Sequence, residues 1–149
     1  MRAVVQRVSR ASVTVDGDII SEIGCGLLVL LGVTHADEQQ NADYLVDKIV
    51  NLRIFDDAEG KMNLSLADTN GGIIVVSQFT LYGDTRGGRR PSFIAAAPGS
   101  EAEGLYDYFV AKAKDLVANV ATGKFGAMMD VELVNDGPVT IILDSEKTI

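Results

Sequence analysis

The sequence has 149 residues, of which 47% are hydrophobic, and it carries a formal net charge of −8 at pH 7. This length favours one domain over residues 1–149 that buries about 70% of its unfolded surface. The negative charge disfavours a broad nucleic-acid surface, and the longest apolar run, Leu27 to Leu31, is too short to span a membrane.

The chain offers little for metal or redox chemistry. Its single cysteine, Cys25, excludes an internal disulfide, and with the single histidine, His35, it does not furnish a zinc site. The first residues show no signal-peptide pattern. We therefore expect a cytoplasmic protein that uses neither a metal nor a cofactor.

The first third of the chain predicts a hairpin, a buried strand and a helix. Arg2 to Val15 and Asp18 to Ile23 are expected strands, joined by the strong turn signal Asp16-Gly17. Leu27 to Val33 is apolar throughout, which is typical of a strand buried on both faces. Asp37 to Leu52 has apolar residues at three- and four-residue spacing, which predicts an amphipathic helix.

The middle of the chain contains the stretch that is the expected floor of a site. Arg53 to Phe55 and Met62 to Leu64 predict short strands that lead into Ile73 to Asp84. The first half of that stretch is apolar at every position, which suits a strand buried on both faces, and the second half alternates like a strand with two different faces. One predicted face carries Ser77, Phe79 and Leu81, and the other carries Gln78, Thr80 and Tyr82. Such side chains at a strand end also occur as ordinary decoration of a sheet edge.

The last third predicts a basic loop, a long helix and two strands. Arg86, Arg89 and Arg90 crowd the loop after the central stretch, either as an anion site or as a solvated face. Ser100 to Glu103 reads as a capping box at a helix start, and Gly123 reads as the glycine that ends the helix. The expected apolar stripe of this helix is Leu105, Phe109, Ala113, Leu116, Val117 and Val120.

The C-terminal part predicts two strands, Met128 to Val134 and Val139 to Asp144, separated by the turn Asn135 to Pro138. No linker or repeat interrupts the chain. The pattern of strands and two main helices favours the α/β class with a mixed sheet.

Two motifs in order resemble the D-aminoacyl-tRNA deacylases: Ser-Gln-Phe-Thr-Leu at 77–81 and Asn-Asp-Gly-Pro-Val-Thr at 135–140. The start, Met-Arg-Ala-Val-Val-Gln-Arg-Val, and the segment Gly123 to Met129 fit the same family, so the resemblance covers essentially the whole chain. It implies a strongly curved, barrel-like sheet, a homodimer, and a cis Gly137-Pro138 bond that one subunit inserts into the site of the other. It also implies hydrolysis of D-aminoacyl-tRNA, and of glycyl-tRNA, without cofactor, as chirality proofreading in translation.

The resemblance also implies roles for individual residues. The expected catalytic residues are Ser77, Gln78, Phe79 and Thr80, and substrate binding and chiral selection fall to Gly137, Pro138, Met129, Phe125 and Arg7. With tRNA as the substrate, the densest positive charge on this acidic chain, Arg86, Arg89 and Arg90, is expected to bind it.

Thr80 is read as a group that positions the reactants, with a covalent nucleophile as the alternative, because a nucleophilic hydroxyl needs an adjacent base. Two rival functions stay open. One is a non-catalytic module that binds protein or RNA. The other is a general Ser/Thr esterase, although the chain lacks a Gly-x-Ser-x-Gly elbow.

Overall fold

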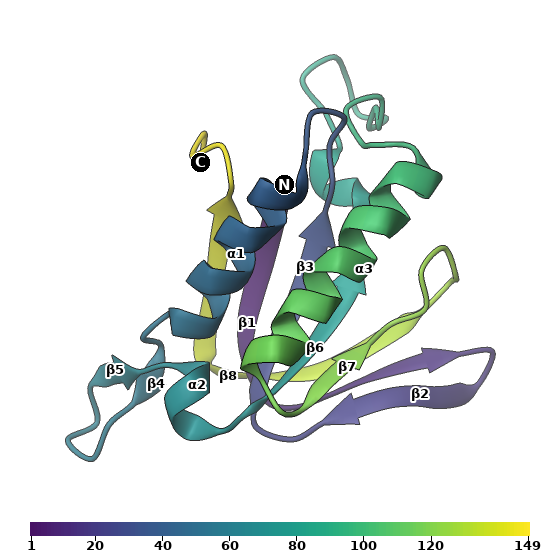
Figure 1. The fold of residues 1–149 in the computed structure, drawn as a ribbon. Coiled ribbons are helices and arrows are strands. Elements are labelled where there is room, and N and C mark those ends of the chain that lie inside the picture. The colour runs from purple at the N-terminus through teal and green to yellow at the C-terminus, as the bar shows by residue number, and fades with distance from the viewer.

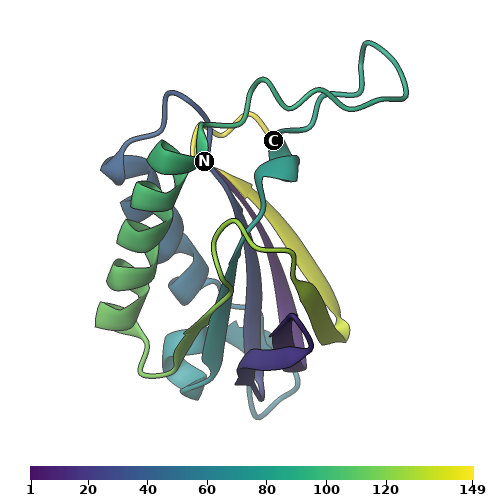
Figure 2. The ribbon, with the colours of Figure 1, turned by 90° about the vertical axis from the view of Figure 1, so that its right-hand side faces the viewer.

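The structure is a computed structural model that describes residues 1–149. A strongly curved, mixed sheet has the strand order β2-β1-β3-β6-β7, and β8 pairs with β1. Helices α1 (Gln39–Asn51) and α3 (Gly99–Leu116) lie on one face of this sheet (Figures 1 and 2). The strands of the sheet are β1 (Arg2–Val15), β2 (Asp18–Ile23), β3 (Gly26–Gly32), β6 (Gly72–Ser77), β7 (Val120–Thr122) and β8 (Asp130–Asp144).

The remaining elements are small. Strands β4 (Phe55–Asp56) and β5 (Met62–Leu64) form a separate two-stranded sheet. Helix α2 (Leu66–Thr69) is one turn long and was not predicted; the Ser65 hydroxyl and the Asp68 carboxylate cap it reciprocally. The predicted α/β class, the curved sheet and the two main helices are confirmed, with α2 as a third helix.

The sheet curves until its ends nearly meet. Strand β1 pairs antiparallel with β2, β3 and β8, whereas β3 pairs parallel with β6 and β6 with β7. The Ser21 hydroxyl of β2 donates a hydrogen bond to the Thr122 carbonyl of β7, which links strands from the two ends of the order. The result is the barrel-like shape at the lower right of Figure 1.

Strands β3 and β6 are buried on both faces, as predicted. Leu27, Val29 and Leu31 pack in the larger core cluster, which includes the buried faces of α1 and α3. Leu28 and Val76 point to the other side, into a smaller cluster of eight buried residues inside the curved sheet. The two parallel strands are therefore fixed from both sides, and their carboxyl ends make a rigid edge.

The prediction of one strand through Ile73 to Asp84 is wrong in its second half. Strand β6 ends at Ser77, and Phe79–Tyr82 forms the 3-10 helix η1. The Gln78 N–H donates to the Leu31 carbonyl at 2.8 Å, and β3 itself ends one residue later. Because no neighbouring strand continues beyond this point, the chain turns instead of staying extended, and the predicted alternation of sides does not occur.

Helix α3 also differs from its prediction. It begins at Gly99, with Pro98 as the N-cap residue and no side-chain cap, so the capping box at Ser100 is absent. It ends at Leu116, not near Gly123, because Val120–Thr122 leaves to form β7 beside β6. Phe109 and Ala113 of the predicted apolar stripe are buried, whereas Leu116 is 53% exposed. The helical residues that are buried are Ala102, Tyr106, Phe109, Val110 and Ala113.

The predicted turn Asn135 to Pro138 is a bulge within one strand. Val8 pairs with Asn135 and Gln6 pairs with Thr140, so residues 136–139 of β8 lie opposite the single residue Arg7. Both predicted C-terminal strands belong to β8 because both pair with the long strand β1. The Gly137–Pro138 peptide bond is cis.

Candidate active site

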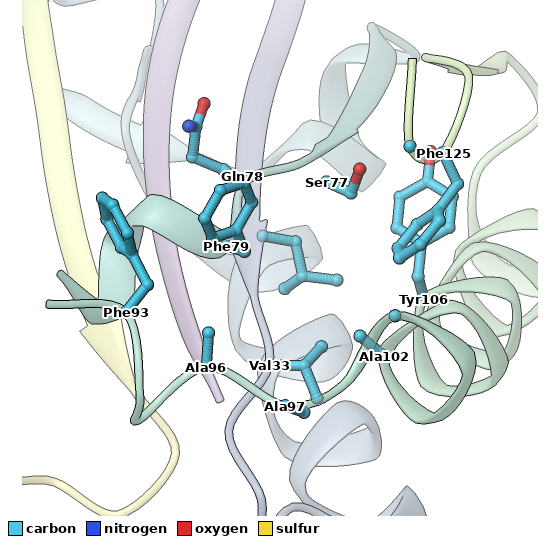
Figure 3. A pocket seen from close by; sticks show the side chains of 13 residues that line it. Val33, Ser77, Gln78, Phe79, Phe93, Ala96, Ala97, Ala102, Tyr106 and Phe125 are labelled. Atoms are coloured by element: carbon cyan, nitrogen blue, oxygen red, sulfur yellow. The ribbon is translucent and has the colours of Figure 1, made fainter. Parts of the chain in front are cut away.

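A cavity of about 390 Å³ lies where β3 and β6 end (Figure 3). Parallel neighbours in a sheet end at the same edge, so the crevice beyond their carboxyl ends is a natural ligand site. Its wall is largely apolar, and its side-chain polar groups come only from Ser77, Gln78 and Tyr106. The lining consists of Leu31, Val33, Ser77, Gln78, Phe79, Phe93, Ala96, Ala97, Gly99, Ala102, Tyr106, Phe125 and Gly126.

The turn after β6, of which Gln78 and Phe79 line the cavity, carries main-chain donors. The first hydrogen bond of η1 joins the Leu81 N–H to the Gln78 carbonyl at 3.2 Å. The N–H groups of Phe79 and Thr80 precede that bond, and no side chain caps the turn. The Gln78 side-chain amide donates to the Thr80 hydroxyl, which has no ionisable partner. The arrangement offers fixed amides and a hydroxyl, but no base beside that hydroxyl.

The opposite wall, residues 93–97, is fastened to the end of β3. The Ala97 N–H donates to the Val33 carbonyl at 2.9 Å, and Thr34 pairs with Ala96 in an isolated β-bridge. The Thr34 hydroxyl adds a bond to the Ala95 carbonyl at 2.5 Å. A ring nitrogen of His35 lies 2.6 Å from the Ile94 carbonyl. The single histidine therefore holds the wall and does not face Thr80.

Tyr106 of α3 forms the back of the cavity. Its hydroxyl donates to the Val75 carbonyl at 2.8 Å, and its ring lies 5.7 Å from the ring of Phe125. Burial raises the pKa of Tyr106 to about 12. A phenol with this pKa stays protonated at neutral pH, so no side chain that lines the cavity is suited to general base catalysis.

The bulge at Gly137 lies outside this cavity. Gly137 has φ +124, and a Cβ there would lie 2.8 Å from Val139 Cγ2 and 3.0 Å from Arg7 Nη2. The buried guanidinium of Arg7 donates to the Asp136 carbonyl at 3.2 Å and to the Ile54 carbonyl at 2.7 Å. Gly137 and Pro138 themselves are exposed. The bulge is thus an exposed loop whose backbone is held by the buried guanidinium of Arg7.

The arginine loop, residues 84–92, begins and ends beside the cavity. Asp84 and Ser92 exchange two backbone hydrogen bonds, at 2.8 and 2.9 Å. Arg86 forms a two-pronged ion pair with Asp84, and this pair holds the pKa of the Asp84 carboxyl well below its usual range. Arg89 and Arg90 are exposed.

The predicted site residues fall into separate groups. Ser77, Gln78, Phe79 and Phe125 line one cavity, with Thr80 exposed beside it. Gly137, Pro138 and Arg7 form the bulge and do not line the cavity. Met129 belongs to neither group; its sulfur accepts the Lys124 N–H at 3.4 Å and its side chain packs against the smaller core cluster.

Sequence reasoning missed the second wall of the cavity, made by Phe93, Ala96, Ala97, Ala102 and Tyr106. Its residues are small or apolar and carry no chemical signal of their own. The available signal was the topology. A parallel neighbour of β6 must end beside Ser77, so the segment that follows this neighbour must form a wall of the site.

The side chains do not form a metal site. No group of three or more His, Cys, Asp and Glu side chains is placed to hold a metal ion. None of the helices combines the length and the hydropathy that a membrane crossing requires.

Comparisons with known proteins agree with the motifs. Residues 4–144 match the family described as D-Tyr-tRNA(Tyr) deacylase. The D-aminoacyl-tRNA deacylase of Clostridioides difficile is 62% identical over 148 residues, which cover 99% of each chain. That of Dehalococcoides mccartyi is 63% identical over 145 residues, which cover 97% of this chain and 95% of the relative.

Solved structures share the fold. One named c-Myc DNA Unwinding Element Binding Protein is 47% identical, with a TM-score of 0.92 over 97% of this chain and 98% of that one. A probable eukaryotic D-amino acid tRNA deacylase is 17% identical, with a TM-score of 0.79 over 95% and 97% of the two chains. The second likeness concerns the fold alone. Because these sequence matches cover nearly the whole chain, the chain belongs to the D-Tyr-tRNA(Tyr) deacylase family.

Proposed function

We propose that this protein hydrolyses the ester bond of D-aminoacyl-tRNA to release the free amino acid and tRNA. The observation that carries the proposal is an apolar cavity beside a turn in which the N–H groups of Phe79 and Thr80 precede the first hydrogen bond of η1. Relatives more than 60% identical over nearly the full chain, named D-aminoacyl-tRNA deacylase, support the substrate class.

Main-chain donors suit this reaction because an aminoacyl ester is already activated. A water oxygen adds to the ester carbonyl carbon, and the N–H groups of Phe79 and Thr80 stabilise the oxyanion. The carbon–oxygen bond to the ribose then breaks, and the ribose oxygen takes the proton that the attacking water loses. The 2′-hydroxyl of the substrate and the Thr80 hydroxyl position the water. Thr80 acts in this way and not as a nucleophile, because its hydrogen-bond partner is the amide of Gln78.

Selection of the D-enantiomer is proposed to come from the carbonyl groups of Gly137 and Pro138. An enzyme that accepts many amino acids must read the atoms they share, and fixed carbonyls bind the ammonium group while excluding an L side chain. Glycine has no side chain to exclude, so glycyl-tRNA is a second substrate. Both residues are exposed and lie outside the cavity of their own chain, which supports a homodimer in which each bulge enters the partner's site.

The activity is tested by deacylation of matched D- and L-tyrosyl-tRNA with purified protein. Rapid release from the D-form and none from the L-form is the expected result. Absence of turnover would point to a non-catalytic binding module, and equal rates on a D-tyrosyl ester without tRNA would point to a general esterase.

The exchange of bulges is tested by mixing two inactive variants. Ala97→Trp fills the cavity and Gly137→Ala disables the bulge. A mixed dimer has one intact site only if the bulge acts across the interface, so unfolding and refolding the mixture restores about a quarter of wild-type activity by random pairing. No recovery, with mixed dimers present by mass, would place both parts of each site in one chain.

A further inference from the structure

We propose that the arginine loop divides into two parts: Arg86 is a structural residue bound to Asp84, whereas Arg89 and Arg90 contact phosphates of the unpaired 3′ end of tRNA. This inference rests on the proposed tRNA substrate and names the residues that meet its backbone. It is based on the ion pairing within the loop and on the position of the loop at the cavity mouth.

The loop is attached where a nucleic acid strand has to pass. Its two ends are joined by the Asp84–Ser92 backbone bonds, and the next residue, Phe93, lines the cavity. The ring of Phe93 meets the ring of Phe79 edge-on at 5.1 Å. The loop itself extends away from the sheet and helices (Figure 2). In the proposed complex, the last ribose lies in the cavity and the nucleotides before it leave along this loop.

The aromatic pair adds a second feature of sites for single-stranded nucleic acid. Phe79 is 58% exposed and Phe93 is 38% exposed, although both lie at the rim of an apolar cavity. Exposed rings next to cations are the usual combination for unpaired nucleotides, since the bases stack and the phosphates meet the charges.

The charges within the loop are unequal. Both prongs of the Arg86 guanidinium contact the Asp84 carboxylate, at 2.9 and 2.6 Å, and the Arg86 N–H donates to the same carboxylate at 2.9 Å. This pair fixes the first turn of the loop and cancels the charge of Arg86. Arg89 and Arg90 have no carboxylate within 4.0 Å.

Two glycines separate the paired arginine from the free ones. Gly88 has φ +156, and a Cβ added there would meet no atom within 4 Å, so no other part of the chain packs against the loop at this point. On a protein of net charge −8, binding of phosphates depends on such local, uncompensated cations. The free pair at Arg89 and Arg90 meets this requirement, and Arg86 does not.

The test measures binding of uncharged tRNA by fluorescence anisotropy at several salt concentrations. Arg89→Ala/Arg90→Ala should weaken binding about tenfold and reduce the slope of log K against log salt by about 1.4, because each lost single-strand phosphate contact removes about 0.7. Arg86→Ala should leave the slope unchanged. Asp84→Asn releases Arg86 and should strengthen binding and steepen the slope.

The control is Arg10→Ala/Lys61→Ala, which removes the same number of exposed cations from elsewhere on the surface. It should behave like the wild type, and circular dichroism checks the folding of every variant. The inference would be overturned if Arg86→Ala, or the control variant, reduced the salt slope as much as Arg89→Ala/Arg90→Ala does. Absence of tRNA binding by the wild type would also overturn it. The binding assay uses tRNA without an ester bond. Its failure can therefore be distinguished from failure of the proposed hydrolysis.

Discussion

The cavity beside Phe79 and the bulge at Gly137 differ in shape, in exposure and in what holds them. The cavity is concave and apolar, and its walls are tied together by backbone hydrogen bonds such as those from Gln78 and Ala97. The bulge is convex and exposed, and the charged side chain of Arg7 supports it. The cavity can hold a ligand but has no charged group to orient it. The bulge presents main chain in a fixed orientation but encloses no cavity that could hold a ligand.

Under the proposed function, this contrast would assign hydrolysis to the cavity and chiral selection to the bulge. Groups that stabilise a developing oxyanion must be rigid, and those at Phe79 follow directly from two strands that are buried on both faces. A group that rejects the wrong enantiomer acts by steric exclusion and can be brought from outside. Changes at the bulge should therefore alter turnover strongly without unfolding the chain, and removal of a hydroxyl from Thr80 or from the cavity residue Tyr106 should do less.

The largest effect is expected for Gly137→Ala. The new Cβ would meet Val139 and Arg7 within 3.0 Å at a backbone angle that L-residues rarely adopt, so the carbonyls of the bulge must move. A displacement of about 1 Å in a positioning group costs roughly a hundredfold in rate, and we expect at least this loss in single-turnover hydrolysis of D-tyrosyl-tRNA.

The matched control is Gly17→Ala, which also has positive φ, +82, but no atom within 4 Å, and lies in the β1–β2 turn. It should lower stability slightly and leave the rate near that of the wild type. If both variants retain full activity, the bulge has no part in the reaction.

Replacement of Arg7 comes next. Arg7→Ala removes two charge-assisted bonds to carbonyl oxygens, each worth about 1.5–3 kcal/mol before relaxation, and we expect about 3 kcal/mol less stability. Turnover of the D-substrate should fall roughly tenfold, with weaker discrimination against the L-form, because the bulge loses its support but keeps its sequence.

Urea unfolding and deacylation of both enantiomers measure these effects. Arg10→Ala on the same strand is the control, since its ion pair with Glu132 is exposed and worth at most about 1 kcal/mol. Unchanged enantiomer discrimination in a destabilised Arg7→Ala protein would separate the bulge from selection.

The sequence was informative where one physical rule acts alone. The hairpin at Asp16-Gly17 follows from turn chemistry, and the burial of β3 and β6 follows from unbroken apolar runs. It was misleading where tertiary context decides. The alternation from Ser77 to Tyr82 is compatible with a strand, but the end of β3 leaves nothing to pair with, and the chain turns into η1.

The same reasoning applies to the site. Ser77, Gln78 and Phe79 were predicted because they belong to the motif that resembles the deacylase family, and the polar groups of Ser77 and Gln78 at a strand end added a chemical signal. Ala97 and Ala102 carry no such signal. The bulge was read as a turn because Asn-Asp-Gly-Pro has turn composition. Only the pairing of both flanks with β1 shows that the strand continues.

A smaller effect is expected for Thr80→Ala. The side chain is exposed and bonded to Gln78, and the amides of Phe79 and Thr80 survive the change. Turnover should fall less than about tenfold, and stability should change by no more than about 0.5 kcal/mol. Thr80→Ser, which keeps a hydroxyl, should recover most of the lost rate. Complete loss in the alanine variant would make Thr80 a nucleophile and would transfer the decisive chemistry from main chain to side chain.

The smallest effect on rate is expected for Tyr106→Phe, which probes the cavity itself. The Val75 carbonyl keeps a second partner, the Gly123 N–H at 3.0 Å, so the variant should lose only about 0.5–1.5 kcal/mol of stability at pH 7 and less than about threefold in turnover. Tyr108→Phe on the exposed side of the same helix is the control at this pH.

The alkaline behaviour of Tyr106→Phe sharpens the test. The raised pKa of Tyr106, about 12, means that the folded state keeps the phenol neutral while the unfolded state begins to ionise near pH 10. The contribution of this group is therefore complete below about pH 10 and is lost as the pH rises toward 12. Burial also raises the pKa of Tyr82. Tyr106→Phe should therefore still lose the part of its stability that depends on Tyr82 at alkaline pH, but not the part that depends on Tyr106. Urea unfolding between pH 9 and pH 12 measures the difference. An unchanged alkaline profile would show that Tyr106 is not buried as a neutral donor, and a collapse of turnover at pH 7 would show that the cavity supplies an acid after all.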